Sequence, residues 1–438
     1  MRTACWYGVL VLAVVGLAGM GGCATSERAE GEGESDTTAT QSTPDPPGPD
    51  LAPQSEEIRT VQLYRGTDER NFPITALRSG DPLTLEFDLM QQKGQPLSVY
   101  FYHADRSWTR DLSPTQFLES YHNDKLLDYR QSQGTVVPYV HYEYRFPNDD
   151  IRFRLSGNYI LRVTKQGQPE AVLFERAFFV TDDTGSLQIG TEPIPVPGQR
   201  QQSVRPVAQF TPPSALGGDP FGYTVCFVRN GRLPDTRCED RPLVGQQPKL
   251  VFELDRSRAF DPTTADYTVD LGNLRAGRGV ENTNRTVTPF QVLLEPDYAQ
   301  FSGRDLDARL NGQIVVRAAL DSYADPALRA EYVRTTFAFV PPNEQPLSGD
   351  VMVAGSFSGM DPGRGTRMQW RPGRRRYEGD VLLKQGRYQY FYSASDPLLQ
   401  RAIQQSQLRR QNTFTAFMYY RDPSQRTDRL LRVTSVQR

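Results

Sequence analysis

Residues 146–163 read FPNDDIRFRLSGNYILRV, a stretch whose pattern decides the fold class of the chain. The proline, asparagine and aspartate at 147–149 favour a turn, because proline pre-sets φ and the short polar side chains hydrogen-bond the local backbone. Apolar residues alternate with polar ones over 151–155, and over 159–163 Tyr159, Leu161 and Val163 alternate with Ile160 and Arg162. Alternation with a period of two is typical of a strand with one buried face. The stretch therefore predicts two β-strands joined by a tight turn at 156–158.

Composition agrees with a β-rich, multidomain protein. The chain has 438 residues, enough for about two to four domains of roughly 100–150 residues each. A hydrophobic fraction of 37% and a mean hydropathy of -0.57 exclude a protein with many membrane spans. With 33 Pro, 35 Gly, 21 Tyr and 22 Phe, short strands joined by turns are favoured over helices. The formal net charge of -2 supplies no field that would attract nucleic acid.

The first residues have the pattern of a bacterial lipoprotein. Residues 1–22 combine a positive charge, a short apolar run and small residues, and predict an export signal rather than a spanning helix. Residues 20–23 read MGGC and resemble a lipobox, so Cys23 is the predicted lipidation site. The alternative is ordinary signal cleavage nearby. No acidic residue follows Cys23 directly, which by lipoprotein sorting rules favours the outer membrane.

Five further segments follow along the chain. Residues 23–56 are acidic and proline-rich, with too few apolar groups to offset the entropy of ordering, and predict a disordered tether. Regularly spaced alternating segments over 57–184 predict an N-terminal β-sandwich. Residues 185–209, with the run IPVPG, are expected to form a linker. A middle β-sandwich over 210–343 and a C-terminal domain over 344–438 complete the expected fold, which is all-β with tandem immunoglobulin-like or early-set sandwiches.

Two cysteines fall in the predicted folded region. Cys226 and Cys238 flank Asn230 and Gly231, a pair that favours a type I′ hairpin because both residues tolerate positive φ. An exported protein permits their oxidation. A two-residue turn would not place the two cysteines opposite each other, so a disulfide requires a bulge or a longer loop. The alternative is two unrelated buried thiols.

Recognisable catalytic machinery is missing from the sequence. The three histidines, His103, His122 and His141, show no metal-binding spacing. Asp149 and Asp150 are adjacent, and neighbours in a strand point to opposite faces rather than converging on one site. The sequence contains no P-loop, nucleophile elbow or dinucleotide fingerprint. We therefore expect a protein that is not an enzyme, with no cofactor, metal, nucleic acid or small-molecule substrate, although a hydrolase with an unrecognised site remains an alternative.

The last domain suggests a different function. It contains DVMVAGSF at 350–357 and GRYQYFY at 386–392, and its spacing resembles the early-set module of glycogen-binding domains. Such modules stack sugars on an aromatic residue after this turn, where Met360 stands instead. Trp370 lies in a strand pattern and fits a core residue better than a sugar platform. The run Arg374–Arg376 fits a solvated hairpin tip better than a phosphate site. A glycan-binding surface lipoprotein is the alternative function.

A longer resemblance runs through most of the mature chain. Ordered segments resemble the type IX secretion system plug protein family, at residues 58–66, 72–74, 77–88, 112–119, 146–163, 265–267, 271–275, 310–312, 325–332, 383–388 and 412–421. The lipobox and the acidic tether are not part of the matched pattern.

The resemblance implies a function and a location. Plug proteins of this family are expected to bind the periplasmic side of the outer-membrane translocon barrel and to occlude its pore. The family supplies no catalytic residues to carry over. A lipid anchor at Cys23 with a tether behind it would hold such a plug beside its pore and raise its effective concentration there.

Overall fold

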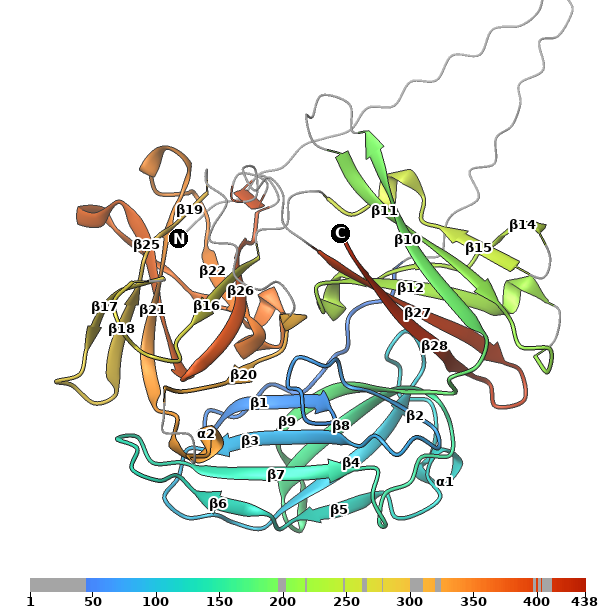
Figure 1. The fold of residues 1–438 in the computed structure, drawn as a ribbon, viewed down its shortest axis with the longest axis horizontal. Coiled ribbons are helices and arrows are strands. Elements are labelled where there is room, and N and C mark those ends of the chain that lie inside the picture. The colour runs from blue at the N-terminus through green and yellow to red at the C-terminus, as the bar shows by residue number, and fades with distance from the viewer. Residues whose placement is uncertain are drawn as a thin grey trace, which may run out of the picture. The chain divides into compact units, whose positions relative to one another are not determined.

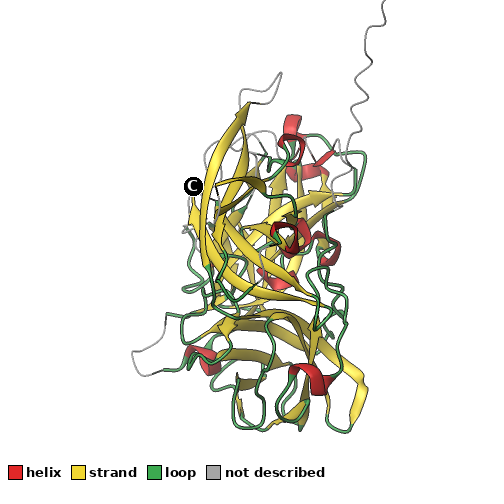
Figure 2. Ribbon diagram, turned by 90° about the vertical axis from the view of Figure 1, so that its right-hand side faces the viewer, coloured by secondary structure: helices red, strands yellow, loops and turns green. Residues whose placement is uncertain are grey.

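The computed structural model describes residues 45–195, 202–216, 219–246, 249–261, 266–277, 279–299, 310–319, 324–396, 399–400, 403 and 412–438. The predicted signal peptide, Cys23 and most of the predicted tether lie outside these residues. The expected all-β class is confirmed, because the described strands form six sheets that pack as three sandwiches (Figure 1). Helices in the described ranges are limited to short turns between strands (Figure 2).

The first sandwich occupies residues 58–181. One sheet has the order β1 (Ile58–Arg65), β3 (Leu83–Leu89), β7 (Val140–Phe146), β6 (Tyr129–Gln131). The other has the order β2 (Ile74–Ala76), β9 (Gln168–Thr181), β8 (Gly157–Lys165), β4 (Leu97–Ala104), β5 (Asn123–Leu126). Aromatic side chains fill the space between them, as where Phe87 stacks on Tyr142 with ring centroids 4.9 Å apart. A short helix, α1 (Pro114–Phe117), follows Ser113.

The second and third sandwiches are also built from two sheets each. The second contains the sheets β10 (Ser186–Pro195), β11 (Gln202–Thr211), β15 (Lys249–Glu253), β14 (Leu243–Gln246) and β13 (Arg237–Glu239), β12 (Tyr223–Arg229), β27 (Thr413–Asp422), β28 (Thr427–Gln437). One sheet of the third contains β16 (Tyr267–Asp270), β26 (Gly386–Ala394), β22 (Val351–Gly355), β23 (Thr366–Arg367), with β20 (Val315–Val316) also on β26. The other contains β17 (Val280–Asn284), β18 (Phe290–Leu294), β21 (Tyr332–Val340), β25 (Arg376–Lys384), β24 (Gln369–Arg371), with β19 (Asp297–Tyr298) also on β21.

Short helices connect these strands. They are α2 (Pro326–Arg329) and the 3₁₀ turns η1 (Pro220–Gly222), η2 (Leu233–Asp235), η3 (Arg256–Arg258), η5 (Pro342–Glu344), η6 (Ser356–Ser358), η7 (Pro362–Arg364) and η8 (Pro372–Arg374).

The order of the sandwiches along the chain differs from the expected tandem. The third sandwich is inserted within the second, because β27 and β28 return to pair beside β12 after residues 267–394 have formed the third. The expected boundary between 343 and 344 separates β21 from β22, yet β21 pairs with β25 from Tyr332 to Phe339. The last two strands of the chain, β27 and β28, lie in the expected C-terminal domain but belong to the second sandwich. Apolar strand faces are completed here by strands distant in sequence, which local patterns do not reveal.

The expected linker at 185–209 contains strands. Residues 186–195 and 202–211 pair as the antiparallel strands β10 and β11. The run IPVPG favoured a linker, and proline cannot donate a ladder hydrogen bond; of the described residues, Pro193 and Pro195 lie on β10. They are accommodated because β10 is the edge strand of its sheet.

The opening stretch forms one strand instead of two. Residues 151–155 bury Ile151 and Leu155 in the first core as the alternation predicts, but their backbone makes only an isolated bridge between Phe153 and Leu118. The following strand, β8, begins at Gly157 and pairs with β4 and β9. A Cβ on Gly157 would lie 2.3 Å from Nε2 of His103, so glycine is required there. Alternation thus matched side-chain burial over 151–155, but it did not predict that Ile160 on β8 is also buried, and the expected hairpin is not formed.

Candidate functional site

The titratable residues singled out in the sequence are dispersed. His103 on β4 and His141 on β7 are buried, whereas His122 is exposed in a loop. Asp149 and Asp150 are exposed in a turn. No group of side chains suited to a metal ion occurs among the residues that the structure describes. Within the same ranges, no helix is long and apolar enough to cross a membrane. The arrangement that the structure does provide is a set of buried polar contacts between sandwiches.

The contact between the first and third sandwiches centres on Asp88. We call Asp88, His141, Tyr332 and Lys384 the Asp88 cluster. Asp88 Oδ1 accepts from His141 Nδ1 at 2.9 Å, and Asp88 Oδ2 accepts from the Tyr332 hydroxyl and from Lys384 Nζ at 2.7 Å each. Strand geometry explains the position of Asp88: it alternates with Phe87 and Leu89, which face the first core, so it points to the opposite face, where the third sandwich covers it.

The ammonium group of Lys384 and the hydroxyl group of Tyr332 each make further contacts besides the one to Asp88. Lys384 Nζ donates a second hydrogen bond to the carbonyl of Ala327 at 2.6 Å and lies 4.2 Å from the centroid of the Tyr139 ring. The Tyr332 hydroxyl is 2.6 Å from Thr60 Oγ1. Only 1% of the side chain of either Lys384 or Asp88 is exposed. A buried ion pair is tolerated only with such hydrogen bonds around it.

The protonation of the Asp88 cluster follows from these contacts. Burial by itself would raise the pKa of Asp88, but the charges and hydrogen bonds of Lys384 and His141 lower it below its usual value. Burial would likewise lower the pKa of His141, but the hydrogen bond to Asp88 and the nearby carboxylate of Glu86 outweigh burial and raise it to about 9. His141 is therefore protonated at neutral pH. Its Nε2 has no hydrogen-bond partner among the described groups, and Glu86 Oε1 lies 3.8 Å away.

The contact between the first and second sandwiches contains the disulfide. In the structure Cys226 on β12 and Cys238 on β13 are bonded and directly opposed in the strand register. The connection spans a loop with η2 instead of a two-residue turn, which is the longer loop that such pairing requires. The disulfide lies in an apolar cluster shared by the two sandwiches, together with Phe179 and Phe417.

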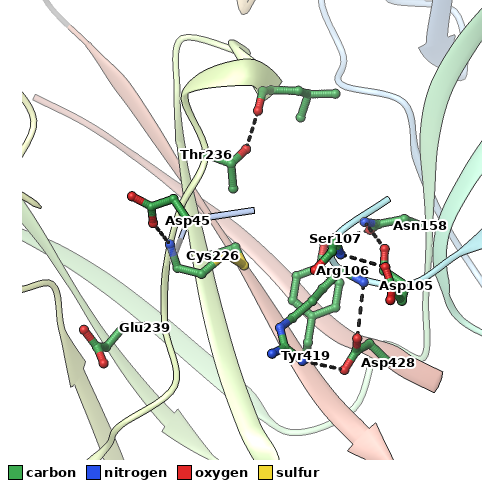
Figure 3. Close-up of a disulfide and its surroundings, with 12 residues drawn as sticks. Asp45, Asp105, Arg106, Ser107, Asn158, Cys226, Thr236, Glu239, Tyr419 and Asp428 are labelled. Carbon is green, nitrogen blue, oxygen red and sulfur yellow. Dashed lines mark hydrogen bonds and ion pairs between the residues drawn. A yellow bond between two sulfur atoms is a disulfide. The ribbon is translucent and has the colours of Figure 1, made fainter. Parts of the chain in front are cut away.

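Hydrogen bonds surround this apolar cluster (Figure 3). Tyr419 donates to Asn158 Oδ1 at 2.7 Å, and Arg106 pairs with Asp428 at 3.0 Å. The next residue of β28, Arg429, pairs at 2.6 Å with Asp182, which directly follows β9 of the first sandwich. Each of these pairs joins a residue of the first sandwich to one of the second. A polar rim around an apolar centre is the usual anatomy of a stable interface.

The contact between the second and third sandwiches uses the loop that follows β12. Asn230 Nδ2 donates to Asp266 Oδ2 at 2.6 Å, Arg232 pairs with the same carboxylate, and Gln389 Nε2 donates to it at 3.0 Å. The backbone at Gly231 is so close to the third sandwich that a Cβ would lie 2.1 Å from the carbonyl oxygen of Asn311. The Asn-Gly pair therefore serves this close approach in addition to its turn.

An apolar surface remains exposed on the first sandwich. Tyr121, Leu127 and Tyr129, which we call the β5–β6 patch, are 72%, 65% and 38% exposed. They flank β5 and β6, the edge strands on the same side of the two sheets. Large exposed apolar side chains along the edge strands of one sandwich make this edge a candidate interaction surface.

The features that suggested glycan or phosphate binding have structural roles. Trp370 packs against the third core and forms an edge-on contact with Tyr377, with ring centroids 5.1 Å apart. The side chains of residues 374–376 pair with carboxylates of Glu378, Glu344 and Glu281. Trp370 therefore offers no flat exposed platform, and the guanidinium groups already have acidic partners.

The comparisons with known proteins agree with this class of molecule, an all-β protein of three sandwiches. Residues 58–182 match the family model described as the type 9 secretion system plug protein 1st domain. This confirms the resemblance seen in the sequence, and it associates the chain with the type 9 secretion system through its first sandwich. The match covers less than a third of the 438 residues.

One solved structure extends the likeness to the fold of most of the chain. The crystal structure of a hypothetical protein from Parabacteroides merdae ATCC 43184 is similar over 90% of this chain and 100% of that one, with a TM-score of 0.78 and 22% identity. A serine-rich repeat adhesion glycoprotein (Srr1) from Streptococcus agalactiae aligns at 8% identity with a TM-score of 0.13, which is too low to bear on the fold. No curated protein matches the sequence.

Sequence reasoning missed the Asp88 cluster. An aspartate that alternates with apolar residues in a strand reads as a solvent-facing position, and nothing in LTLEFDL distinguishes solvent from a second sandwich. The signal that could have been used was the pair Asp88 and His141, on strands that become neighbours in the sheet.

Proposed function

We propose that this protein is a non-enzymatic plug of the type IX secretion system, which binds the periplasmic side of the outer-membrane translocon barrel and occludes its pore. The observation that carries the proposal is the match of residues 58–182 to the plug-protein first domain. Two features of the structure support it. The polar contacts between sandwiches give a body suited to blocking an opening, and the β5–β6 patch offers the matched domain a surface for the barrel.

The location proposed with this function is the periplasmic side of the outer membrane, with lipid on Cys23. Acyl chains would bury in one leaflet at about 0.8 kcal/mol per methylene. Replacement of Cys23 by Ser is expected to move the protein from the membrane fraction to the soluble periplasmic fraction. Mass spectrometry of the mature N-terminus checks the modification directly, and an unmodified N-terminus other than residue 23 contradicts it.

The first test is purification of the tagged protein from detergent-solubilised envelope, followed by mass spectrometry. We expect one very large barrel protein in near-equal amounts. A preparation without the barrel, under conditions that keep other envelope complexes intact, would overturn the proposal.

The β5–β6 patch can be tested in the same experiment. We expect the double variant Tyr121→Ser, Leu127→Ser to recover several-fold less barrel, because exposed apolar area is removed from the contact. Val287→Ser is the matched control, since Val287 is an exposed apolar residue of the third sandwich. Equal recovery with all three proteins would place the contact elsewhere on the molecule.

A further inference from the structure

A cavity of about 470 Å³ lies where the first and third sandwiches meet, beside the Asp88 cluster. Its volume falls in the range of roughly 300–1,000 Å³ that ligand pockets occupy. The first sandwich contributes Arg59, Thr60 and Arg176 to the wall, and the third contributes Arg364 and residues 380–383. Neither the proposed function nor the family match assigns this cavity a role.

Two strand edges open into the cavity. Strand β1 is the edge of its sheet and pairs only with β3. Strand β25 pairs with β21 along its length, but β24 pairs with its other side only as far as Glu378, and Met368 lies against Gly379. Four consecutive residues of β25, 380–383, line the cavity. Since successive side chains point to opposite faces, a wall of consecutive residues presents the unpaired backbone edge of the strand.

The cavity also carries an excess of positive charge. Three guanidinium groups, from Arg59, Arg176 and Arg364, share the wall with the single carboxylate of Asp380. Arg364 pairs with Asp361 at 3.2 Å, but the other two lack an ion pair among the described residues.

The hydrogen bonds of these two arginines go to neutral oxygens. Arg59 donates to the carbonyl of Ile58 at 2.7 Å. Arg176 donates to Gln54 Oε1 at 2.7 Å and to the carbonyl of Glu175 at 2.9 Å. Burial and then the neighbouring charge of Arg364 lower the pKa of Arg176 to about 9, so an anion in the cavity would relieve an unfavourable charge.

We propose that the cavity binds an extended acidic peptide segment of a partner protein, which adds as a strand along residues 380–383 of β25 and places a carboxylate on Arg176. Strand addition uses main-chain hydrogen bonds for affinity and alternate side-chain positions for specificity. Guanidinium groups recognise carboxylates in a bidentate manner. The edge of β25 favours a peptide over a small anion, because a small anion would leave the backbone groups of that edge unused.

The proposal is tested by fluorescence anisotropy with the purified protein and no barrel present, so its failure is separate from failure of the plug function. The probe is a labelled peptide of about eight residues, the length of one strand, that alternates glutamate and valine. We expect saturable binding, and we expect Arg176→Gln to weaken it about tenfold or more because a charge-assisted contact is lost. The control Arg152→Gln, at an exposed arginine outside the cavity, should leave the affinity unchanged.

A second variant keeps the test independent of misfolding. Asp380→Asn removes the only carboxylate of the cavity wall, so it should strengthen binding of the acidic peptide, which a damaged protein would not do. Equal binding of a lysine–valine peptide, or an affinity unaffected by Arg176→Gln, would overturn the proposal. Inorganic phosphate that displaces the probe and binds as tightly would also overturn it, in favour of a small-anion site.

A peptide with proline at alternate positions, which lacks the backbone N–H donors at those positions, should bind far more weakly. Equal binding of this peptide would rule out strand addition.

Discussion

Asp88 is held between two sandwiches by hydrogen bonds on both of its carboxylate oxygens. His141 lies opposite it on the neighbouring strand of the same sheet, while Tyr332 and Lys384 reach it from the third sandwich. Each of these groups would be costly to bury alone, because an unpaired buried charge loses its hydration. The contact is therefore specific: it is stable only when both surfaces present their matching groups.

The elevated pKa of His141 predicts a pH dependence of stability. A histidine whose pKa rises from 6.5 to about 9 on folding contributes about 3 kcal/mol below pH 6.5, and this contribution is lost as the pH rises through 9. We expect His141→Gln to unfold at a lower temperature than the parent at pH 6, and the gap to narrow by pH 9.5. Thermal unfolding at both pH values measures it. A gap that widens with pH would contradict the assigned protonation.

Gly157 predicts a steric effect beside the other buried histidine. We expect Gly157→Ala to destabilise the protein by about 1–3 kcal/mol, since the added Cβ would lie 2.3 Å from His103 Nε2. Chemical denaturation measures the loss. The matched control is Gly373→Ala, where no atom lies within 4 Å of the added group; a comparable loss in both variants would contradict the steric account.

At the scale of single elements, the β12–β13 hairpin contacts both neighbouring sandwiches. Its strands carry the disulfide into the apolar cluster shared with the first sandwich. Its loop carries Asn230 to Asp266 of the third sandwich. The disulfide closes a loop with a sequence separation of 12, and so restricts the unfolded hairpin as well as the folded one.

We expect loss of this disulfide to cost about 3 kcal/mol, from the entropy of the loop it closes. The double variant Cys226→Ala, Cys238→Ala should show this loss in denaturant unfolding. A reducing agent should destabilise the parent by a similar amount and leave the double variant unaffected. If the reducing agent destabilises both proteins equally, its effect does not act through this disulfide.

At the scale of the whole molecule, each sandwich shares buried polar contacts with the other two. Asp88 joins the first to the third, Asp428 joins the first to the second, and Asp266 joins the second to the third. Because the third sandwich is inserted within the second, the chain leaves the second sandwich and re-enters it after the third is complete. On re-entry, β27 pairs with β12 over the full length of β12. Contacts of this kind favour one relative placement of the sandwiches, as a pore-blocking role would require.

Removal of one charge from the Asp88 cluster should weaken this arrangement. We expect Lys384→Met to cost about 3–5 kcal/mol, because Asp88 stays buried without its strongest partner. Lys249→Met is the matched control at an exposed lysine. Adding Asp88→Asn to Lys384→Met should recover part of the loss, measured by denaturant unfolding. A double variant that is less stable than the sum of both single variants would contradict a direct charge pairing.

The amino-acid sequence alone determined the all-β class and the strand-rich N-terminal sandwich. These features depend on local properties: alternation of side chains and turn formers. The family resemblance of the first domain also came from the sequence, since each of its motifs is a short uninterrupted run of residues. Local patterns could not distinguish the buried extended segment at 151–155 from a strand, or the proline-bearing edge strand β10 from a linker.

Only the tertiary structure decided which strands share a sandwich and which polar residues are buried. The insertion of the third sandwich depends on pairing between β12 and β27, whose residues are separated by most of the second half of the chain. Asp88 and Arg176 look like ordinary strand residues in the sequence, and their roles arise from what covers them. Burial and pairing across sandwiches are properties of surfaces that meet in space, so they appear only once the whole chain has folded.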